Sequence, residues 1–257
     1  MNSAARLLNV ISKLLAHPVD TQTLCHVVWA NVFELGSGPE DKHDAVISTL
    51  QAIRAEIDLT TTALEAKGIT PALYVDQFNR LRTVVSPAYF NASWSGLVGT
   101  INQPDTRLAI AWAAEVLPDN ESEVSIEERS ALLDEVSALL ATLDGADLPP
   151  AVRSFIGKQL KNIQASLRMY DVRGVKVVAE AIEQFAGAAM VARSTLKSEV
   201  ANATPAARGF MARANGLVTK VVNVLELAEK VKKGSGALIE MADAVRIAIE
   251  NMPTGGG

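Results

Sequence analysis

The sequence of 257 residues has few of the side chains on which catalysis, metal binding and nucleic-acid recognition depend. One cysteine excludes a disulfide framework within the chain, and no Cys-x-x-Cys pair or Cys/His ladder predicts a zinc site. Aromatic residues make up 5 % of the chain, and its net charge of −5 disfavours a generally basic nucleic-acid-binding protein. We therefore expect no metal, no cofactor and no nucleic-acid partner.

Long hydrophobic runs are also missing. Near the N-terminus Asn9, Ser12 and Lys13 interrupt the leucines, so an amphipathic helix is favoured over a secretory peptide, with a transit-like presequence as the alternative. The longest uncharged run, between Arg82 and Asp105, contains prolines and glycines and cannot be a spanning helix. We expect a cytoplasmic protein.

Helical periodicity is present nearly everywhere. Within residues 37–68, apolar positions recur at steps of 4, 3, 4, 3 and 4, which indicates one long helix with a buried stripe. The stripe consists of Val46, Leu50, Ile53, Ile57, Thr60 and Leu64. Because it covers under three heptads, a seam inside a bundle is favoured over a dimeric coiled coil. The sequence predicts an all-α fold of about ten helices with no sheet.

Proline, glycine and capping residues divide the chain into these helices. We expect helices over residues 20–35 and 105–117, a helix that starts at the capping box Ser125–Glu128, another from Pro150, and an Ala-rich helix to about residue 198. A last stripe contains Leu238, Ala242, Val245 and Ile249, before a flexible glycine tail. The polar stretch after Pro118 suggests two bundles, 1–118 and 119–257, with a single domain as the alternative.

Charge is unevenly distributed along the chain. Residues 119–147 hold nine acids and one base, whereas residues 148–257 hold fifteen bases and nine acids. We interpret the acidic block as a solvated face near basic helices of the same chain, with a docking surface for a basic partner as the alternative. Residues 217–233 combine an apolar stripe with lysines at their end, so core packing, docking of a partner helix and contact of residues 217–251 with an anionic membrane all stay open.

No catalytic group of residues is evident. Cys25 and His26 are neighbours in a predicted helix, where their side chains point about 100° apart, so a buried cysteine and a surface histidine explain the pair. The paired carboxylates, such as Glu127–Glu128, occupy helix first turns or polar faces. We predict no catalytic residues.

Residues 87–99 form the most unusual stretch, because three aromatic residues stand within six positions beside asparagine, serine and glycine. Loops on a rigid scaffold often carry binding groups, so Tyr89, Asn91 and Trp94 are the predicted partner- or ligand-binding residues. The favoured interpretation of the stretch is nevertheless a loop that crosses the bundle and uses its aromatic side chains as anchors, with binding as the alternative.

Residues 148–187 are similar to helical segments of bacterial proteins, through the pattern Ile163, Leu167, Tyr170, Gly174 followed by an Ala-rich helix. The resemblance points to a bacterial source and implies no activity.

These observations favour a non-enzymatic helical interaction or regulatory protein with a protein partner of unknown identity and with unknown oligomeric state. A bacterial accessory role in stress response or phage defence fits this hypothesis. The alternatives are a membrane-acting effector that uses residues 217–251, and a small-ligand binder or enzyme that combines the 87–99 loop with His17, His26 or His43.

Overall fold

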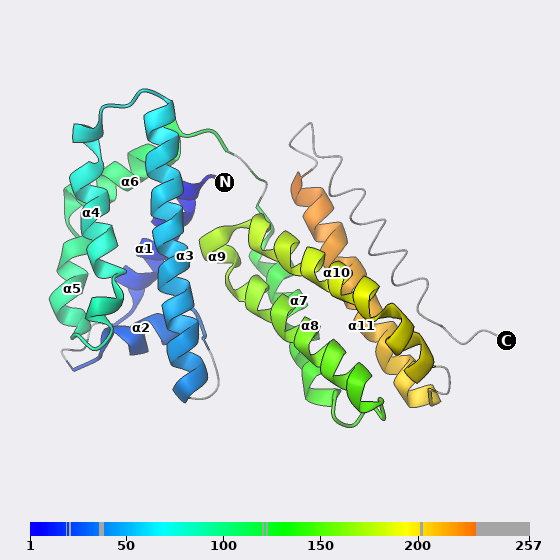
Figure 1. The fold of residues 1–257 in the computed structure, drawn as a ribbon. Helices are drawn as coiled ribbons and strands as arrows, with labels where there is room; N and C mark the ends of the chain where they lie inside the picture. Colours follow the sequence, from blue (N-terminus) through cyan, green and yellow to red (C-terminus); the bar gives the residue numbers. More distant parts are fainter. Residues whose placement is uncertain are drawn as a thin grey trace. The chain divides into compact units, whose positions relative to one another are not determined.

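The computed structural model describes residues 1–18, 20, 22–35, 39–119, 121, 123–200 and 203–229. Within them the protein has eleven α-helices and two short 3-10 turns (Figure 1). No β-strand occurs among those residues, and Leu24 and Ser93 form an isolated antiparallel bridge. The all-α prediction is therefore confirmed.

The chain divides into two compact units. The N-terminal unit comprises residues 1–120 with 171–174, and the C-terminal unit comprises residues 121–170 and those from 175 onward. The predicted domain boundary after residue 118 stays a prediction, because compactness alone does not show that either unit folds by itself. The helices of the N-terminal unit are α1 (Ser3–Ala16), α2 (Cys25–Val32), α3 (Pro39–Ala66), α4 (Val75–Val84), α5 (Trp94–Ile101) and α6 (Pro104–Val116).

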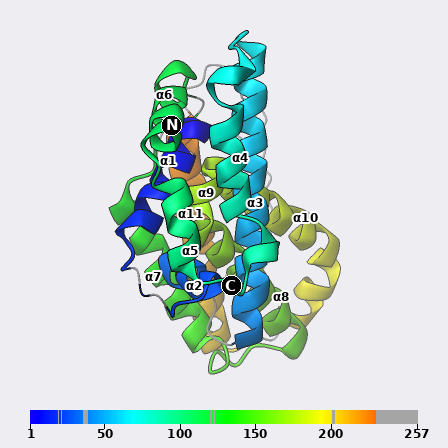
Figure 2. The same cartoon turned by 90° about the vertical axis from the view of Figure 1, so that its left-hand side faces the viewer.

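The helix α3 runs the length of the N-terminal unit, with α4 beside it (Figures 1 and 2). All six members of its predicted stripe are buried, each with at most 1 % of its surface exposed. After α3 ends, Gly68 has a φ of +73°, a left-handed conformation that favours glycine over any side chain. The sequence pattern thus located this helix and its end correctly.

The packing of α1 depends on polar groups at its start. The Asn2 side chain accepts a hydrogen bond from the amide of Ala5 at the start of α1, and donates to the carbonyl oxygens of Ala114 and Leu117 at the end of α6 (2.9 Å in each case). One residue therefore caps two helices and joins their ends.

The seam between α1 and α3 also contains buried polar pairs. Arg6 donates to Glu56 Oε2 through Nε (3.0 Å) and Nη2 (2.7 Å), and both side chains are at least nine-tenths buried. One turn away on each helix, Thr60 Oγ1 donates to Ser3 Oγ at 2.8 Å. These pairs fix which turn of α1 lies against which turn of α3.

The C-terminal unit contains α7 (Ile126–Thr142), α8 (Pro150–Arg168), α10 (Val175–Val200) and α11 (Pro205–Glu229). The single-turn α9 (Tyr170–Arg173) lies between α8 and α10 in the sequence, and all but its first residue belong to the N-terminal unit. The four long helices form a bundle, since each packs against two of the others. The predicted capping box at the start of α7 is confirmed: Glu128 N donates to Ser125 Oγ (3.1 Å), and Ser125 N donates to Glu128 Oε2 (3.2 Å).

One ion pair within this unit joins the acidic and basic parts of the sequence. Lys220 Nζ on α11 lies 2.8 and 3.0 Å from the two carboxylate oxygens of Glu135 on α7. This contact supports the interpretation of the acidic block as a face near basic helices of the same chain.

Two predicted segments differ from the structure. The helix expected over residues 20–35 is only α2, because Asp20 forms a turn with Gln22 and Leu24 joins the bridge to Ser93. The loop expected over residues 87–99 contains a short 3-10 turn (Pro87–Tyr89) and becomes α5 from Trp94 onward, so only residues 90–93 are irregular. The predicted last stripe (Leu238, Ala242, Val245 and Ile249) and the glycine tail lie outside the described residues.

No helix within the described ranges is both long enough and apolar enough to cross a membrane. The described part of the 217–251 segment belongs to α11, and its apolar stripe is buried in the core of the C-terminal unit. Leu217, Val218, Val221 and Leu225 are each at most 4 % exposed. The remainder of that segment lies outside the described residues.

Candidate functional site

The loop before α5 is held in place by its backbone. Cys25 N donates to the carbonyl of Ala92 (2.9 Å), His26 N donates to that of Phe90 (3.1 Å), and Trp94 N donates to that of Thr23 (2.9 Å). Residues 23–27 and 89–94, which we call the loop junction, are therefore paired even though more than sixty residues separate them in the sequence. Such pairing fixes the loop and positions whatever side chains it exposes.

The three residues predicted to bind occupy different environments at the loop junction. Trp94 is fully buried, and its ring lies edge-on to Trp29 with centroids 6.2 Å apart. Tyr89 is 39 % exposed and Asn91 is also exposed. Trp94 therefore positions the loop as part of the core, which leaves Tyr89 and Asn91 as the members able to contact another molecule directly.

Two histidines lie beside the loop. The His26 ring stacks on Phe90 with centroids 4.7 Å apart, and His43 from α3 lies edge-on to both rings at 5.1 Å. His26 Nδ1 is 3.1 Å from the carbonyl oxygen of Phe90, so this nitrogen carries the proton and donates it. His17 is the C-cap residue of α1.

Cys25 is unsuited to nucleophilic chemistry. Its side chain is buried, and burial raises the pKa of the thiol to about 11, although a backbone hydrogen bond lowers it slightly. Near neutral pH the sulfur is therefore a protonated thiol rather than the thiolate that attacks electrophiles. In addition, no group of three or more histidine, cysteine or acidic side chains with metal-binding geometry occurs among the residues that the structure describes.

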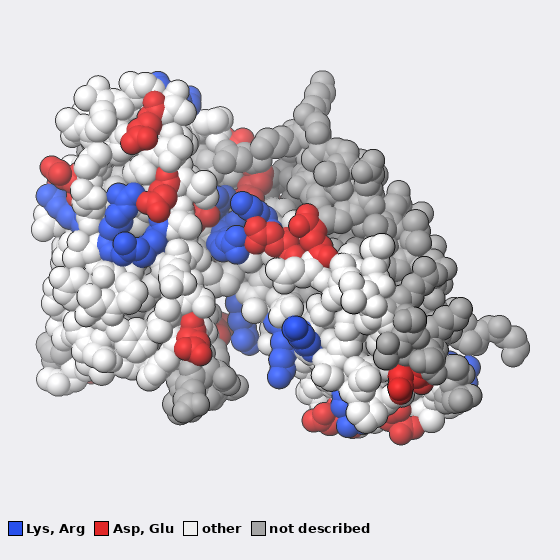
Figure 3. Space-filling view, in the orientation of Figure 1, with Lys and Arg blue, Asp and Glu red and all other residues white. Residues whose placement is uncertain are grey.

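The loop junction contains no Asp, Glu, Lys or Arg, and part of its surface is apolar. Leu24 and Val27 are each 37 % exposed, so together with Tyr89 they account for several of the exposed large apolar side chains in the described ranges. Both paired segments come from uncharged runs, one between Asp20 and Glu34 and the other between Arg82 and Asp105. On the face shown in Figure 3, the region of the N-terminal unit over α2 and α5 is almost entirely uncharged.

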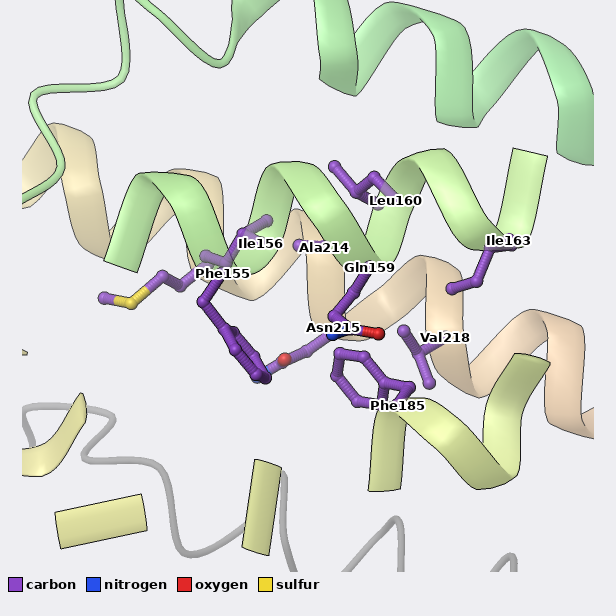
Figure 4. Close-up of a pocket in the computed structure, with 10 residues that line it drawn as sticks. Phe155, Ile156, Gln159, Leu160, Ile163, Phe185, Ala214, Asn215 and Val218 are labelled. Carbon is purple, nitrogen blue, oxygen red and sulfur yellow. The ribbon is translucent and has the colours of Figure 1, made fainter. Parts of the chain in front are cut away.

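The C-terminal unit has a separate pocket between α8, α10 and α11 (Figure 4). Its walls are almost entirely apolar, and Phe155 and Phe185 lie across it with ring centroids 6.2 Å apart. Gln159 is 5 % exposed and extends into this space between Phe185 and Val218. Its Oε1 is buried and accepts no hydrogen bond from any group that the structure describes.

Sequence reasoning missed both Gln159 and the contact of His43 with Phe90. Gln159 stands one position before Leu160 of the apolar stripe on α8, and this placement at the edge of the stripe was the available signal. The contact of His43 with Phe90 depends on how α2, α3 and the loop pack, and no pattern in the sequence encodes it.

Comparison of the chain with protein-family models, with curated proteins and with solved structures gave no match. The functional assignment therefore depends on the residues themselves.

Proposed function

We propose that the protein is a non-enzymatic cytoplasmic interaction protein that binds a partner protein through the loop junction. The observation that carries this proposal is the pairing of residues 23–27 with 89–94, which presents Tyr89 and Asn91 on a fixed backbone beside Leu24 and Val27. A fixed loop loses little conformational freedom on binding, so more of the contact energy appears as affinity.

The side chains of this surface indicate what kind of partner surface it would bind. Tyrosine is enriched at the centre of protein interfaces, because its ring buries a large area and its hydroxyl forms hydrogen bonds. Asn91 adds an amide that both donates and accepts. Neither of the two paired segments contains an acidic side chain, a lysine or an arginine. We therefore propose a partner surface that mixes apolar and neutral polar groups and is neither strongly basic nor strongly acidic.

A photo-crosslinking experiment tests the proposal. In the native host, Tyr89→benzoylphenylalanine places a crosslinker at the loop junction, and Leu108→benzoylphenylalanine places one at a 70 % exposed position on α6 as the matched control. We expect a discrete protein adduct from position 89 that position 108 does not give.

The captured protein is then purified and titrated against variants of the chain. We expect Tyr89→Ala and Asn91→Ala each to weaken binding by about ten-fold or more, the size of effect seen for side chains that contribute to binding, whereas Leu108→Ala leaves it unchanged. Identical adducts from both positions, no adduct, or equal affinities for all variants would each overturn the proposal.

Trp94 needs a different variant because it lies in the core. Trp94→Ala removes a large buried ring and is expected to cost about 3–5 kcal/mol of stability, so it lowers binding and helicity together. Circular dichroism and thermal unfolding measure this loss. Binding that survives in a destabilised Trp94→Ala protein would show that the loop does not need this anchor.

A further inference from the structure

The outward face of α8 is basic. The helix contains arginine and lysine residues but no acidic residue. It packs against α7 and α10, and on the side turned away from them Lys158 and Lys161 are exposed and Arg168 is half-buried. These three cations recur at steps of three and seven residues, so they lie on one face of the helix.

The outward face of α7 is acidic. Glu127 and Asp134 are exposed and stand seven residues apart, so they share one side of the helix. Arg129, the single base of α7, is turned away from them, and its guanidinium lies 5.3 Å from the centre of the Tyr170 ring. The outward face of α7 therefore has acids and no base.

The charges of these two faces have no counter-charge in the same chain. Neither the three cations of α8 nor the two acids of α7 form an ion pair with another residue that the structure describes. The helices contact each other through different sides, where Gln164 of α8 donates to Ser137 Oγ of α7 at 2.9 Å. Both charged faces therefore stay open to another molecule.

We propose that the acidic face of α7 (Glu127 and Asp134) and the basic face of α8 (Lys158, Lys161 and Arg168) bind each other between two copies of the chain. A second copy is the favoured occupant because it supplies the complement of both faces, whereas another acidic or basic protein would supply the complement of one. The inference concerns the C-terminal unit and does not depend on the loop junction or on the proposed function.

The spacing of the charges fits this contact. Glu127 and Asp134 are seven residues apart, as are Lys161 and Arg168, so each pair spans about 10 Å along its helix. When α7 of one copy lies along α8 of another, two ion pairs can therefore form at once. Lys158 lies one turn from Lys161 and adds a third positive charge to the same face.

Small side chains allow the two helices to approach closely. Between its charged positions α7 exposes alanine and serine, and so does α8. On α7 these residues are Ser130, Ala131, Ala138 and Ala141, and on α8 they are Ala151, Ser154 and Ala165. Packed helices have axes about 8–10 Å apart, and small residues at the contact favour the shorter separation. The opposite charges then come within reach of each other.

Sedimentation velocity of the full chain measures the self-association. We expect the mean sedimentation coefficient of the wild-type protein to rise with protein concentration at low salt. In about 0.5 M salt it should stay at the monomer value, because salt screens exposed charges.

Two charge reversals assign the association to these faces. Lys161→Glu/Arg168→Glu makes both faces acidic, and Glu127→Lys/Asp134→Lys makes both basic. Each variant should associate about ten-fold more weakly than the wild type or less, because like charges then meet. As the matched control, Lys67→Glu/Arg107→Glu makes the same change in net charge at exposed residues of the N-terminal unit and should associate like the wild type.

Mixing the two reversed variants separates the proposed contact from a general effect of charge. In the mixture, the acidic α8 of one protein meets the basic α7 of the other, and the natural pairing is kept in the opposite direction. The equimolar mixture should therefore associate like the wild type, although neither variant does so alone. A single chain that carries all four substitutions should also recover association.

A wild-type chain that stays monomeric at low salt at every concentration would overturn the inference. A reversed variant that associates like the wild type would also overturn it, as would a mixture that stays monomeric. Circular dichroism shows whether each variant is folded. If a double variant does not fold, the single variants Arg168→Glu and Glu127→Lys repeat the mixing test with the same expected outcomes.

Discussion

Buried polar groups are paired in one helix seam of this protein and unpaired in another. Between α1 and α3, Arg6 is paired with Glu56 and Ser3 with Thr60. At the pocket where α8 packs on α10 and faces α11, Gln159 has an oxygen that accepts nothing from the described residues. A paired group in an apolar seam fixes the register of the helices, whereas an unpaired one costs stability. The comparison teaches that a polar atom in a core fixes the register of two helices where it is paired, and lowers stability where it is not.

The largest effect is expected when the paired seam is broken. Glu56→Ala leaves the Arg6 guanidinium buried without its carboxylate and should lower the free energy of unfolding by about 3–5 kcal/mol in a urea titration. The double variant Arg6→Met/Glu56→Leu should recover most of this loss, since no charge remains buried.

Asp58→Ala is the matched control on the same helix. Its carboxylate pairs with Arg82 at the surface and is 66 % exposed, so the expected loss is below about 1 kcal/mol. Equal losses from Glu56→Ala and Asp58→Ala would break the comparison, because the buried pair would then be worth no more than an exposed one.

In the seam with the unpaired Gln159 oxygen, removing the polar group should raise the free energy of unfolding instead of lowering it. Gln159→Met replaces the unpaired amide by an apolar side chain of similar size, and should raise the free energy of unfolding by roughly 1 kcal/mol. Gln164→Met loses a hydrogen bond at a half-exposed position and should give no gain. A loss of stability in Gln159→Met would show that this oxygen is paired in solution, and the contrast between the seams would disappear.

A glycine-to-alanine substitution outside both seams measures how backbone conformational freedom affects stability, separately from any buried polar group. Gly99 lies in α5, two residues before its end, and a Cβ there would meet nothing within 4 Å. Gly99→Ala should therefore stabilise the protein by roughly 0.5–1 kcal/mol in thermal unfolding. Gly68→Ala provides the reverse control, because its φ of +73° strains any side chain.

The smallest effect is expected at an exposed ion pair of the N-terminal unit. Arg80 Nη1 lies 2.5 Å from Asp105 Oδ2, and its hydrogen bond is the main cause that lowers the pKa of the Asp105 carboxyl. A carboxyl whose pKa is lower in the folded state adds stability above its unfolded pKa, and this contribution is lost as the pH falls through the folded pKa. Asp105→Asn should therefore be slightly less stable at neutral pH and equal to the wild type in strong acid. A difference between the two proteins that did not change with pH would contradict this assignment.

Much of the fold could be predicted because local signals and tertiary packing agree. The stripe on α3 from Val46 to Leu64 is buried as its spacing indicates, and the capping box at Ser125 starts α7. The prediction was wrong where a long-range contact outweighs the local pattern. A helix was expected from residue 20, but Leu24 forms a bridge with Ser93 and the helix begins only at Cys25. No rule based on neighbouring residues can foresee a partner so far along the chain.

The candidate binding residues were only partly predictable for the same reason. The sequence drew attention to Tyr89, Asn91 and Trp94 through their rarity and spacing. It could not distinguish the buried ring of Trp94 from the exposed ring of Tyr89, because both are aromatic residues in one uncharged run. The direction of each side chain is set by the three backbone hydrogen bonds to residues 23–26.

The two caps made by Asn2 have a consequence for how the chain folds during synthesis. Its amide group binds the carbonyl oxygens of Ala114 and Leu117, so the first helix of the N-terminal unit is completed by the last. On a ribosome that makes the chain from its N-terminus, α3 can cover part of α1 early, but the surface of α1 that packs on α6 stays exposed until α6 has emerged. Contacts between residues so far apart in the sequence form slowly. In the C-terminal bundle, by contrast, three of the four helix pairs in contact are consecutive long helices of the chain. We therefore expect the N-terminal unit to depend more on chaperones during translation than the C-terminal bundle.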